Sequence, residues 1–357
     1  MYAQERGNAL TFTPNASLAT FSSEETNKMT GTAYGGELSY RFNTSKNATR
    51  WMRMINLKSI DFIFNYKNMY DVRRLTTNAT GDSGDSYALL VGLSIPLASY
   101  KNIHLDFSPA LGLNYVTKTW FTNQNPIISS HVNLTSKAAL NLTAAVSNDI
   151  SITAGLDVFH YSNGGTRVPN NGMNMLNLGV GITKHFIKRE TAAISSSSTL
   201  DYRTHTFDVG INSGKRGVYQ SKDNSFKTGL YAGYNYRINP ILAIGTGIDM
   251  VYYHTIYDPL RHNETYQSTG TSYERWRVGA AIGPDLWMGR LAAGVKYGYY
   301  LHYNSYMPIN TYWTAALKYR ITSWGALQVK TYLHHTEADY IGFGFLLSRG
   351  LVQRTKT

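Results

Sequence analysis

Apolar and polar residues alternate with a period of two along almost the whole chain. In residues 103–116, "IHLDFSPALGLNYV", Ile103, Leu105 and Phe107 share one face, and Asp106 lies on the other. Successive side chains of a strand point to opposite faces. Elsewhere the polar face also carries Glu, Arg and Lys. A polar face opposite a wholly apolar one suits a membrane β-barrel, with lipid outside and a polar interior.

Two other fold classes are less consistent with the sequence. A soluble sandwich also alternates, but the strands here run long and aromatic residues cluster at their ends, as in membrane proteins. A helical membrane protein is excluded, because the longest clean apolar stretch, "YALLVGLSIPLA" from Tyr87, is too short to span a bilayer. We therefore expect an all-β, antiparallel outer-membrane barrel.

About sixteen strands are predicted. Connections after even-numbered strands are mostly short, and those after odd-numbered strands are often longer, as in barrels with short periplasmic turns and long outer loops. The strands are expected to start near residues 8, 33, 57, 86, 103, 127, 149, 173, 199, 225, 240, 272, 290, 310, 324 and 339.

A Ser-rich stretch divides the chain into two halves of eight strands. We expect residues 188–200 to be a periplasmic connection between residues 1–187 and residues 201–357. One sixteen-stranded barrel or two tandem eight-stranded barrels would both satisfy the backbone hydrogen bonds. We favour one barrel, because it needs a single closure; fourteen strands are a further alternative.

Charge and cysteine content restrict the partners and the chemistry. The formal charge of +12 favours anionic partners such as phosphate groups or acidic lipid. A lipid-facing wall and export do not suit a nucleic-acid partner. The absence of cysteine excludes a disulfide framework and thiolate chemistry. Ala3, before Gln4, is interpreted as the tail of a signal peptide that this sequence lacks.

The stretch "GLDVFHYSNGGTRVPNNGMN", residues 155–174, begins as a strand and ends in a loop of Gly, Pro and Asn. Val158 lies on the apolar face of its strand, and His160 and Ser162 lie on the same face at the next alternate positions. Asn174 begins the corresponding row of the next strand. We expect these three polar side chains to converge on the lipid-facing wall at the extracellular rim, where polar groups require a functional reason.

This stretch resembles the signature of the lipid A 3-O-deacylases, also called acyloxyacyl hydrolases, which are eight-stranded outer-membrane barrels with an active site facing the outer leaflet. The resemblance covers residues 1 to about 187, and the remainder is similar to longer, two-part relatives from Bacteroidetes-type bacteria. The residues that carry it are His160, Tyr161, Ser162, Asn163, Gly164, Gly165, Pro169, Asn170 and Gly172.

The resemblance implies a serine esterase that acts on lipid A of lipopolysaccharide. His160 would be the general base and Ser162 the nucleophile, since a serine needs an adjacent base near neutral pH. Asn163 and the backbone N–H groups of Gly164 and Gly165 would stabilise the oxyanion, each such donor being worth about 3 kcal/mol.

The resemblance assigns further roles in the same stretch. Pro169, Asn170 and Gly172 would shape the loop. From the basic excess of the chain, Arg167 inside the motif is a possible phosphate contact. Neither a cofactor nor a metal is expected, and the oligomeric state is left open.

Asn174 departs from the family pattern, which has an acidic residue there. Asparagine can orient an imidazole but cannot offset the imidazolium charge. In a serine-protease triad, replacing aspartate by asparagine costs about four orders of magnitude in turnover. We expect slow hydrolysis.

Two other constellations are interpreted as structural. In "YLHYNSYMPIN", His302, Ser305 and Pro308 are similar in spacing to the motif. The alternation, however, places His302 on the lumen side with Lys296. In "YLHHTEADY", a metal site is not expected, because the alternation divides the candidate ligands between two faces. Those candidates are His334, His335, Glu337 and Asp339.

Four basic residues are assigned to one outer loop or its borders: Lys215, Arg216, Lys222 and Lys227. They would either hold lipid A phosphates through charge-assisted contacts or be ordinary rim residues.

Two functions follow from the sequence. The first is an outer-membrane esterase that removes an ester-linked acyl chain from lipid A. The alternative is a porin-like or structural barrel with a degenerate motif, in which sixteen strands would enclose an aqueous lumen.

Overall fold

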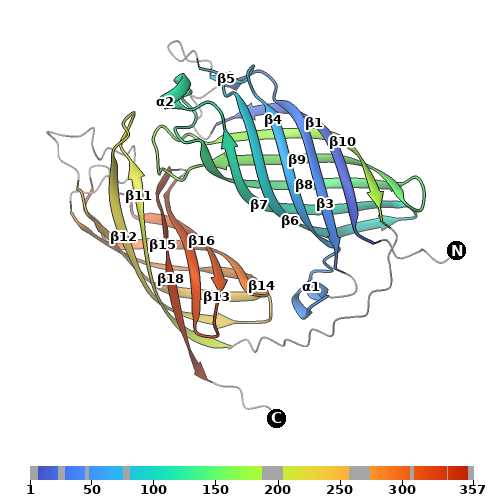
Figure 1. The fold of residues 1–357 in the computed structure, drawn as a ribbon. Coiled ribbons are helices and arrows are strands. Elements are labelled where there is room, and N and C mark those ends of the chain that lie inside the picture. Colours follow the sequence, from blue (N-terminus) through green and yellow to red (C-terminus); the bar gives the residue numbers. More distant parts are fainter. Residues whose placement is uncertain are drawn as a thin grey trace. The chain divides into compact units, whose positions relative to one another are not determined.

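The structure is a computed structural model that describes residues 7–22, 29–44, 48–74, 81–186, 204–256, 274–305, 309–335 and 337–352. Its long strands form two closed antiparallel barrels of eight strands each (Figure 1). The chain divides into two compact units, Met1–Asn163 with Pro169–Ser197, and Gly164–Val168 with Ser198–Thr357. The Ser-rich connection at residues 188–200 lies outside the described residues.

The first barrel uses most of the N-terminal half. Its strands are β1 (Ala9–Phe21), β3 (Tyr34–Asn43), β4 (Ser59–Asn68), β6 (Asp85–Tyr100), β7 (Ile103–Val116), β8 (Val132–Ala145), β9 (Ile150–Ser162) and β10 (Met173–His185). Two short strands, β2 (Met29–Thr30) and β5 (Arg73–Arg74), pair outside the barrel, and the connections contain helices α1 (Arg50–Met54) and α2 (Trp120–Asn123).

The second barrel is built from consecutive strands. They are β11 (His205–Gly217), β12 (Asn224–Arg237), β13 (Leu242–Tyr253), β14 (Trp276–Met288), β15 (Leu291–His302), β16 (Thr311–Arg320), β17 (Gly325–His334) and β18 (Glu337–Val352).

The sixteen long strands confirm the fold class, but the preference for one barrel was wrong. Strand β1 pairs with β10, and β11 pairs with β18. The first and last strands of each half therefore pair with each other. Neither half leaves an exposed hydrogen-bonding edge that would have to pair with the other half.

The walls of both barrels follow the alternation seen in the sequence. On β9, the side chains of Leu156 and Val158 are 42% and 44% exposed, whereas that of the next residue, Phe159, is fully buried. Outward-facing apolar rows are the surface that lipid requires. None of the described helices has the length and apolar character needed to cross a bilayer.

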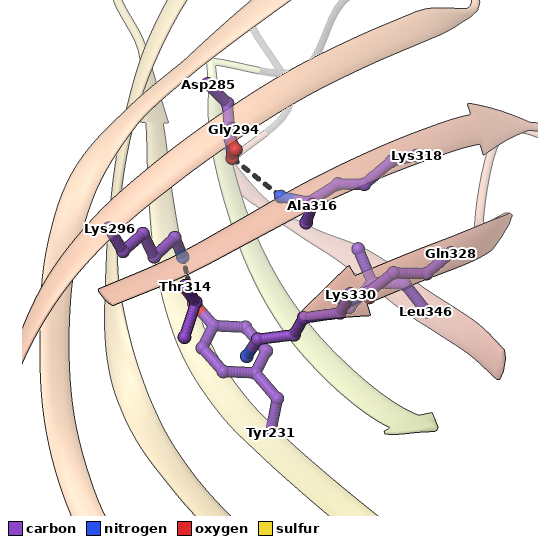
Figure 2. Close-up of a pocket in the computed structure, with 10 residues that line it drawn as sticks. All are labelled: Tyr231, Asp285, Gly294, Lys296, Thr314, Ala316, Lys318, Gln328, Lys330 and Leu346. Carbon is purple, nitrogen blue, oxygen red and sulfur yellow. Dashed lines mark hydrogen bonds and ion pairs between the residues drawn. The ribbon is translucent and has the colours of Figure 1, made fainter. Parts of the chain in front are cut away.

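Side chains fill the barrel interiors. In the first barrel, the Lys137 ammonium lies 2.7 Å from a Glu37 carboxylate oxygen. In the second, Lys318 contacts Asp285 at 2.7 Å beside a cavity of about 20 Å³ (Figure 2). Such a cavity holds about one water molecule. The wide aqueous lumen considered for sixteen strands is therefore replaced by two packed interiors.

Candidate active site

The motif occupies the end of β9 on the outer wall. His160 and Ser162 continue the outward row of Leu156 and Val158, and both are half-buried. The alternating neighbours Phe159 and Tyr161 point inward and are fully buried. Residues i and i+2 of a strand lie roughly 6.6 Å apart and share a face, so an imidazole and a hydroxyl are presented together on the outer wall.

Asn174 faces His160 across the β9–β10 ladder. The two residues are directly paired in the register, and Asn174 Oδ1 lies 2.8 Å from His160 Nδ1. Asn174 Nδ2 donates to the carbonyl of Phe21 at 3.3 Å. Because the amide nitrogen is used there, its oxygen faces the imidazole and accepts the Nδ1 proton. His160 Nε2 then carries the lone pair, as a general base requires.

The Ser162 hydroxyl contacts a side chain from the following loop. Asn170 Nδ2 donates to Ser162 Oγ at 2.9 Å, and Asn170 Oδ1 lies 3.3 Å from the same oxygen. Asn170 Oδ1 also accepts the backbone N–H of Asn163 at 3.1 Å. Sequence reasoning gave Asn170 only a loop-shaping role, because alternation along strands does not report contacts made by a loop.

The first barrel fixes this loop from a second connection, between α2 and β8. Ser129 Oγ donates to the Pro169 carbonyl at 2.8 Å, and the Asn171 N–H donates to the Ile127 carbonyl at 2.9 Å. Ile128 pairs with Asn170 in an isolated antiparallel bridge. Ile127 and Ile128 are both buried, so the loop rests on core residues.

Glycines of the motif adopt the left-handed backbone region. Gly164, Gly165 and Gly172 have φ of 61°, 80° and 65°, where residues with a Cβ are disfavoured. A Cβ on Gly172 would also lie 3.0 Å from His160 Cε1. Gly164–Val168 group with the second compact unit, and within that unit Arg167 donates to the carbonyl of Lys222.

His302 departs from the expected orientation. A bulge in β15 pairs Val278 with His302 and the next residue, Gly279, with Tyr300. The extra residue, Leu301, changes the parity, so His302 shares the outward face of Val278. Its imidazole lies 2.7 Å from the Glu274 carboxylate. The lumen placement of His302 was therefore wrong; Pro308 lies outside the described residues.

The second histidine-rich stretch is divided between environments, but not as its alternation indicated, because Asp339 is buried like His334 and does not share the environment of His335. His334 and Asp339 are fully buried, whereas His335 is exposed. Asp339 pairs with Lys227 and, at 3.2 Å, with Arg277. Among the described residues, no group of side chains has the composition and proximity of a metal site.

The four basic residues lie in or beside the β11–β12 connection, as predicted, but two of them form ion pairs within the second barrel. Lys227 lies within β12 and pairs with Asp339 in the second barrel. Arg216 lies at the end of β11, is 5% exposed and pairs with Glu337. Both cations are thus engaged within this unit, while Lys222 is exposed.

Two closed antiparallel barrels with apolar outer walls place the protein in the class of outer-membrane β-barrels. The model of the family "Lipid A 3-O-deacylase (PagL)" matches residues 34–183, and that of "Acyloxyacyl hydrolase, C-terminal domain" matches residues 205–348. Together the two matches span most of the chain. The chain belongs to the lipid A 3-O-deacylase (acyloxyacyl hydrolase) family.

Similarities to solved structures are distant. Neisserial surface protein A is 11% identical, with a TM-score of 0.33, covering 50% of this chain and 96% of that one. The outer-membrane enzyme PagL is 16% identical, with a TM-score of 0.30, covering 49% and 98%. Omp33 of Acinetobacter baumannii is 9% identical, with a TM-score of 0.17, covering 98% and 100%. No curated protein matches the sequence.

Proposed function

We propose that the protein is a serine esterase that removes an ester-linked acyl chain from lipid A at the extracellular rim. The observation that carries this proposal is the pair His160 and Ser162 on one outward row, with Asn174 orienting the imidazole at 2.8 Å. Polar side chains at the end of a lipid-facing row are costly without a function. Family membership supplies the substrate class.

The proposed reaction is acyl transfer in two steps. His160 Nε2 takes the proton of Ser162 Oγ as that oxygen attacks the ester carbonyl, and then gives it to the departing sugar oxygen. Water, deprotonated by the same imidazole, hydrolyses the acyl-serine and releases a fatty acid. Asn174 Oδ1 keeps Nδ1 protonated throughout but cannot neutralise the imidazolium, which predicts a slow enzyme.

Several predicted site roles remain parts of this proposal. Asn163, Gly164 and Gly165 stay predictions as oxyanion donors, and Arg167 stays a prediction as a phosphate contact. Pro169 and Gly172 are assigned to loop geometry, supported by the anchored Pro169 carbonyl and the positive φ of Gly172.

Mass spectrometry of lipid A tests the proposal. Cells that express the wild type are expected to lose one hydroxyacyl chain, and cells that express Ser162→Ala are expected to retain it. A matched control is Ser136→Ala, since Ser136 faces His160 from β8 without belonging to the motif. Identical lipid A from wild type and Ser162→Ala, at equal barrel content, would refute the esterase.

A further inference from the structure

Five residues inside the motif belong to the compact unit of the second barrel. Gly164–Val168 follow Asn163 directly in the sequence, yet they group with Ser198–Thr357. We propose that the β11–β12 connection, residues 217–223, positions this segment, and with it the oxyanion donors expected at Gly164 and Gly165. This inference rests on the proposed function and gives the second barrel a part in the reaction.

The β11–β12 connection holds the segment through its backbone. The N–H of Gly217 donates to the carbonyl of Gly165 at 2.8 Å, and the N–H of Gln220 donates to the carbonyl of Val168 at 3.0 Å. Val168 and Tyr219 form a parallel bridge. Both hydrogen bonds use carbonyl oxygens of the segment, so they do not occupy the N–H groups that would face an oxyanion.

The start of β18 packs against the two glycines of the segment. A Cβ on Gly164 would overlap the side chain of Ile341, and a Cβ on Gly165 would lie 2.9 Å from the carbonyl oxygen of Ala338. Both glycines are buried. Close packing against β18, together with the hydrogen bonds to the β11–β12 connection, therefore fixes the backbone of the segment.

The proposed reaction depends on a fixed segment. A hydrogen-bond donor stabilises an oxyanion effectively when its position is set before the reaction. Glycine has more backbone freedom than any other residue, so Gly164 and Gly165 are poor donors unless other residues hold them. A displacement of about 1 Å in an active site costs up to about 100-fold in rate. The contacts with the second barrel supply the restraint that two successive glycines lack.

Gly217 is the position at which a substitution disturbs the segment selectively. A Cβ on Gly217 would lie 2.7 Å from Arg167 Cα and 2.9 Å from the backbone nitrogen of Val168. The φ of Gly217 lies outside the left-handed region, so its backbone accepts alanine or valine. The matched control is Gly325→Ala in the same barrel, where the Cβ would lie 3.1 Å from the Thr322 hydroxyl and would not meet the segment.

Two measurements on the full chain in detergent micelles test the proposal. Trypsin cleavage after Arg167, detected by mass spectrometry as a new N-terminus at Val168, reports whether the segment is held, and the heat-denatured chain gives the unprotected rate. Hydrolysis of p-nitrophenyl hexanoate gives kcat and KM, with Ser162→Ala as the background. Heat-modifiable mobility on gels gives the amount of folded barrel.

The folded wild type and Gly325→Ala are expected to resist cleavage after Arg167. Gly217→Ala and, more strongly, Gly217→Val are expected to be cleaved there and to lose about 10- to 100-fold in kcat per folded barrel, with KM changed less than about threefold. A purely structural role would instead reduce the amount of folded barrel and leave kcat per folded barrel unchanged. Gly217→Ala, the smaller change, keeps the test available if valine prevents folding.

Three results would overturn the inference while Ser162-dependent hydrolysis stands. The first is cleavage of the folded wild type after Arg167 at the unprotected rate. The second is cleavage of the folded Gly217 variants with an unchanged kcat, and the third is continued protection of those variants, whatever their kcat. A wild type as inert as Ser162→Ala overturns the proposed function, and this inference with it.

Discussion

At the scale of single residues, Asn174 determines the state of the proposed base. Its amide nitrogen is held by the Phe21 carbonyl, so its oxygen is committed to His160 Nδ1. This arrangement selects the useful tautomer but supplies no negative charge. The contact that would orient the imidazole of the proposed site is therefore present, without the charge that an acidic residue would supply.

Asn174→Asp is predicted to increase kcat by about tenfold or more, because a carboxylate stabilises the imidazolium that forms during attack; the opposite change in a serine protease costs about 10⁴. Ester hydrolysis by the purified variant measures this. Asn171→Asp adds the same charge to the loop without the contact to His160 and is the control. A kcat that stays unchanged or falls in Asn174→Asp would contradict the assigned role.

Gly172→Ala is predicted to lower kcat by about tenfold while the barrel remains folded. Alanine is disfavoured at φ of 65°, and its Cβ would lie 3.0 Å from the His160 ring, so the imidazole must shift. Heat-modifiable mobility on gels checks folding, and ester hydrolysis checks the site. Wild-type kcat in the folded variant would show that the ring position tolerates the displacement.

At the scale of elements, alternation predicted the strands and the outward row of His160, Ser162 and Asn174. It failed at His302, where one bulge residue reverses the parity of all that follows. A single sequence carries little signal for such a bulge, because any residue type can occupy it. Asn170 was likewise beyond reach, since its partners come from a loop whose path depends on tertiary contacts.

The β8–β9 turn predicts a pH-dependent stability. Hydrogen bonds from Lys184 and Ser147 lower the pKa of Asp149 from 3.8 to about 2. A lowered carboxyl pKa stabilises the folded state above pH 3.8, and this contribution is lost as the pH falls through about 2. Asp149→Asn should therefore lower the urea unfolding midpoint above pH 3.8 and converge with the wild type below pH 2.

The matched control for this turn is Asp223→Asn. Asp223 accepts a hydrogen bond from Ser221 at 2.7 Å, as Asp149 does from Ser147, but the described residues give it no lysine partner. Its unfolding midpoint should change less than that of Asp149→Asn. A midpoint difference for Asp149→Asn that persists unchanged into acid would refute the lysine contribution.

At the scale of the whole molecule, strand number was predictable but closure was not. Both one barrel and two satisfy the backbone, and the choice depends on whether β1 meets β10 or a strand of the other half. That pairing joins residues far apart in the sequence. The alternation of apolar and polar residues along the strands is the same for one barrel of sixteen strands and for two barrels of eight.

The protein is predicted to show no steady single-channel conductance in planar bilayers. Eight-stranded barrels leave room for side chains only, and ion pairs such as Lys318 with Asp285 and Lys137 with Glu37 occupy these interiors. A sixteen-stranded porin of known conductance serves as the positive control. Reproducible open-channel steps from the purified protein would contradict two packed interiors.

Under the proposed function, the outward direction of Ser162 determines how substrate would reach it. A hydroxyl that opens sideways into the bilayer meets glycolipids by diffusion in two dimensions. The proposed turnover should therefore follow the mole fraction of substrate in the membrane and fall when inert lipid dilutes it at constant total amount. A water-filled cleft would respond to bulk concentration instead.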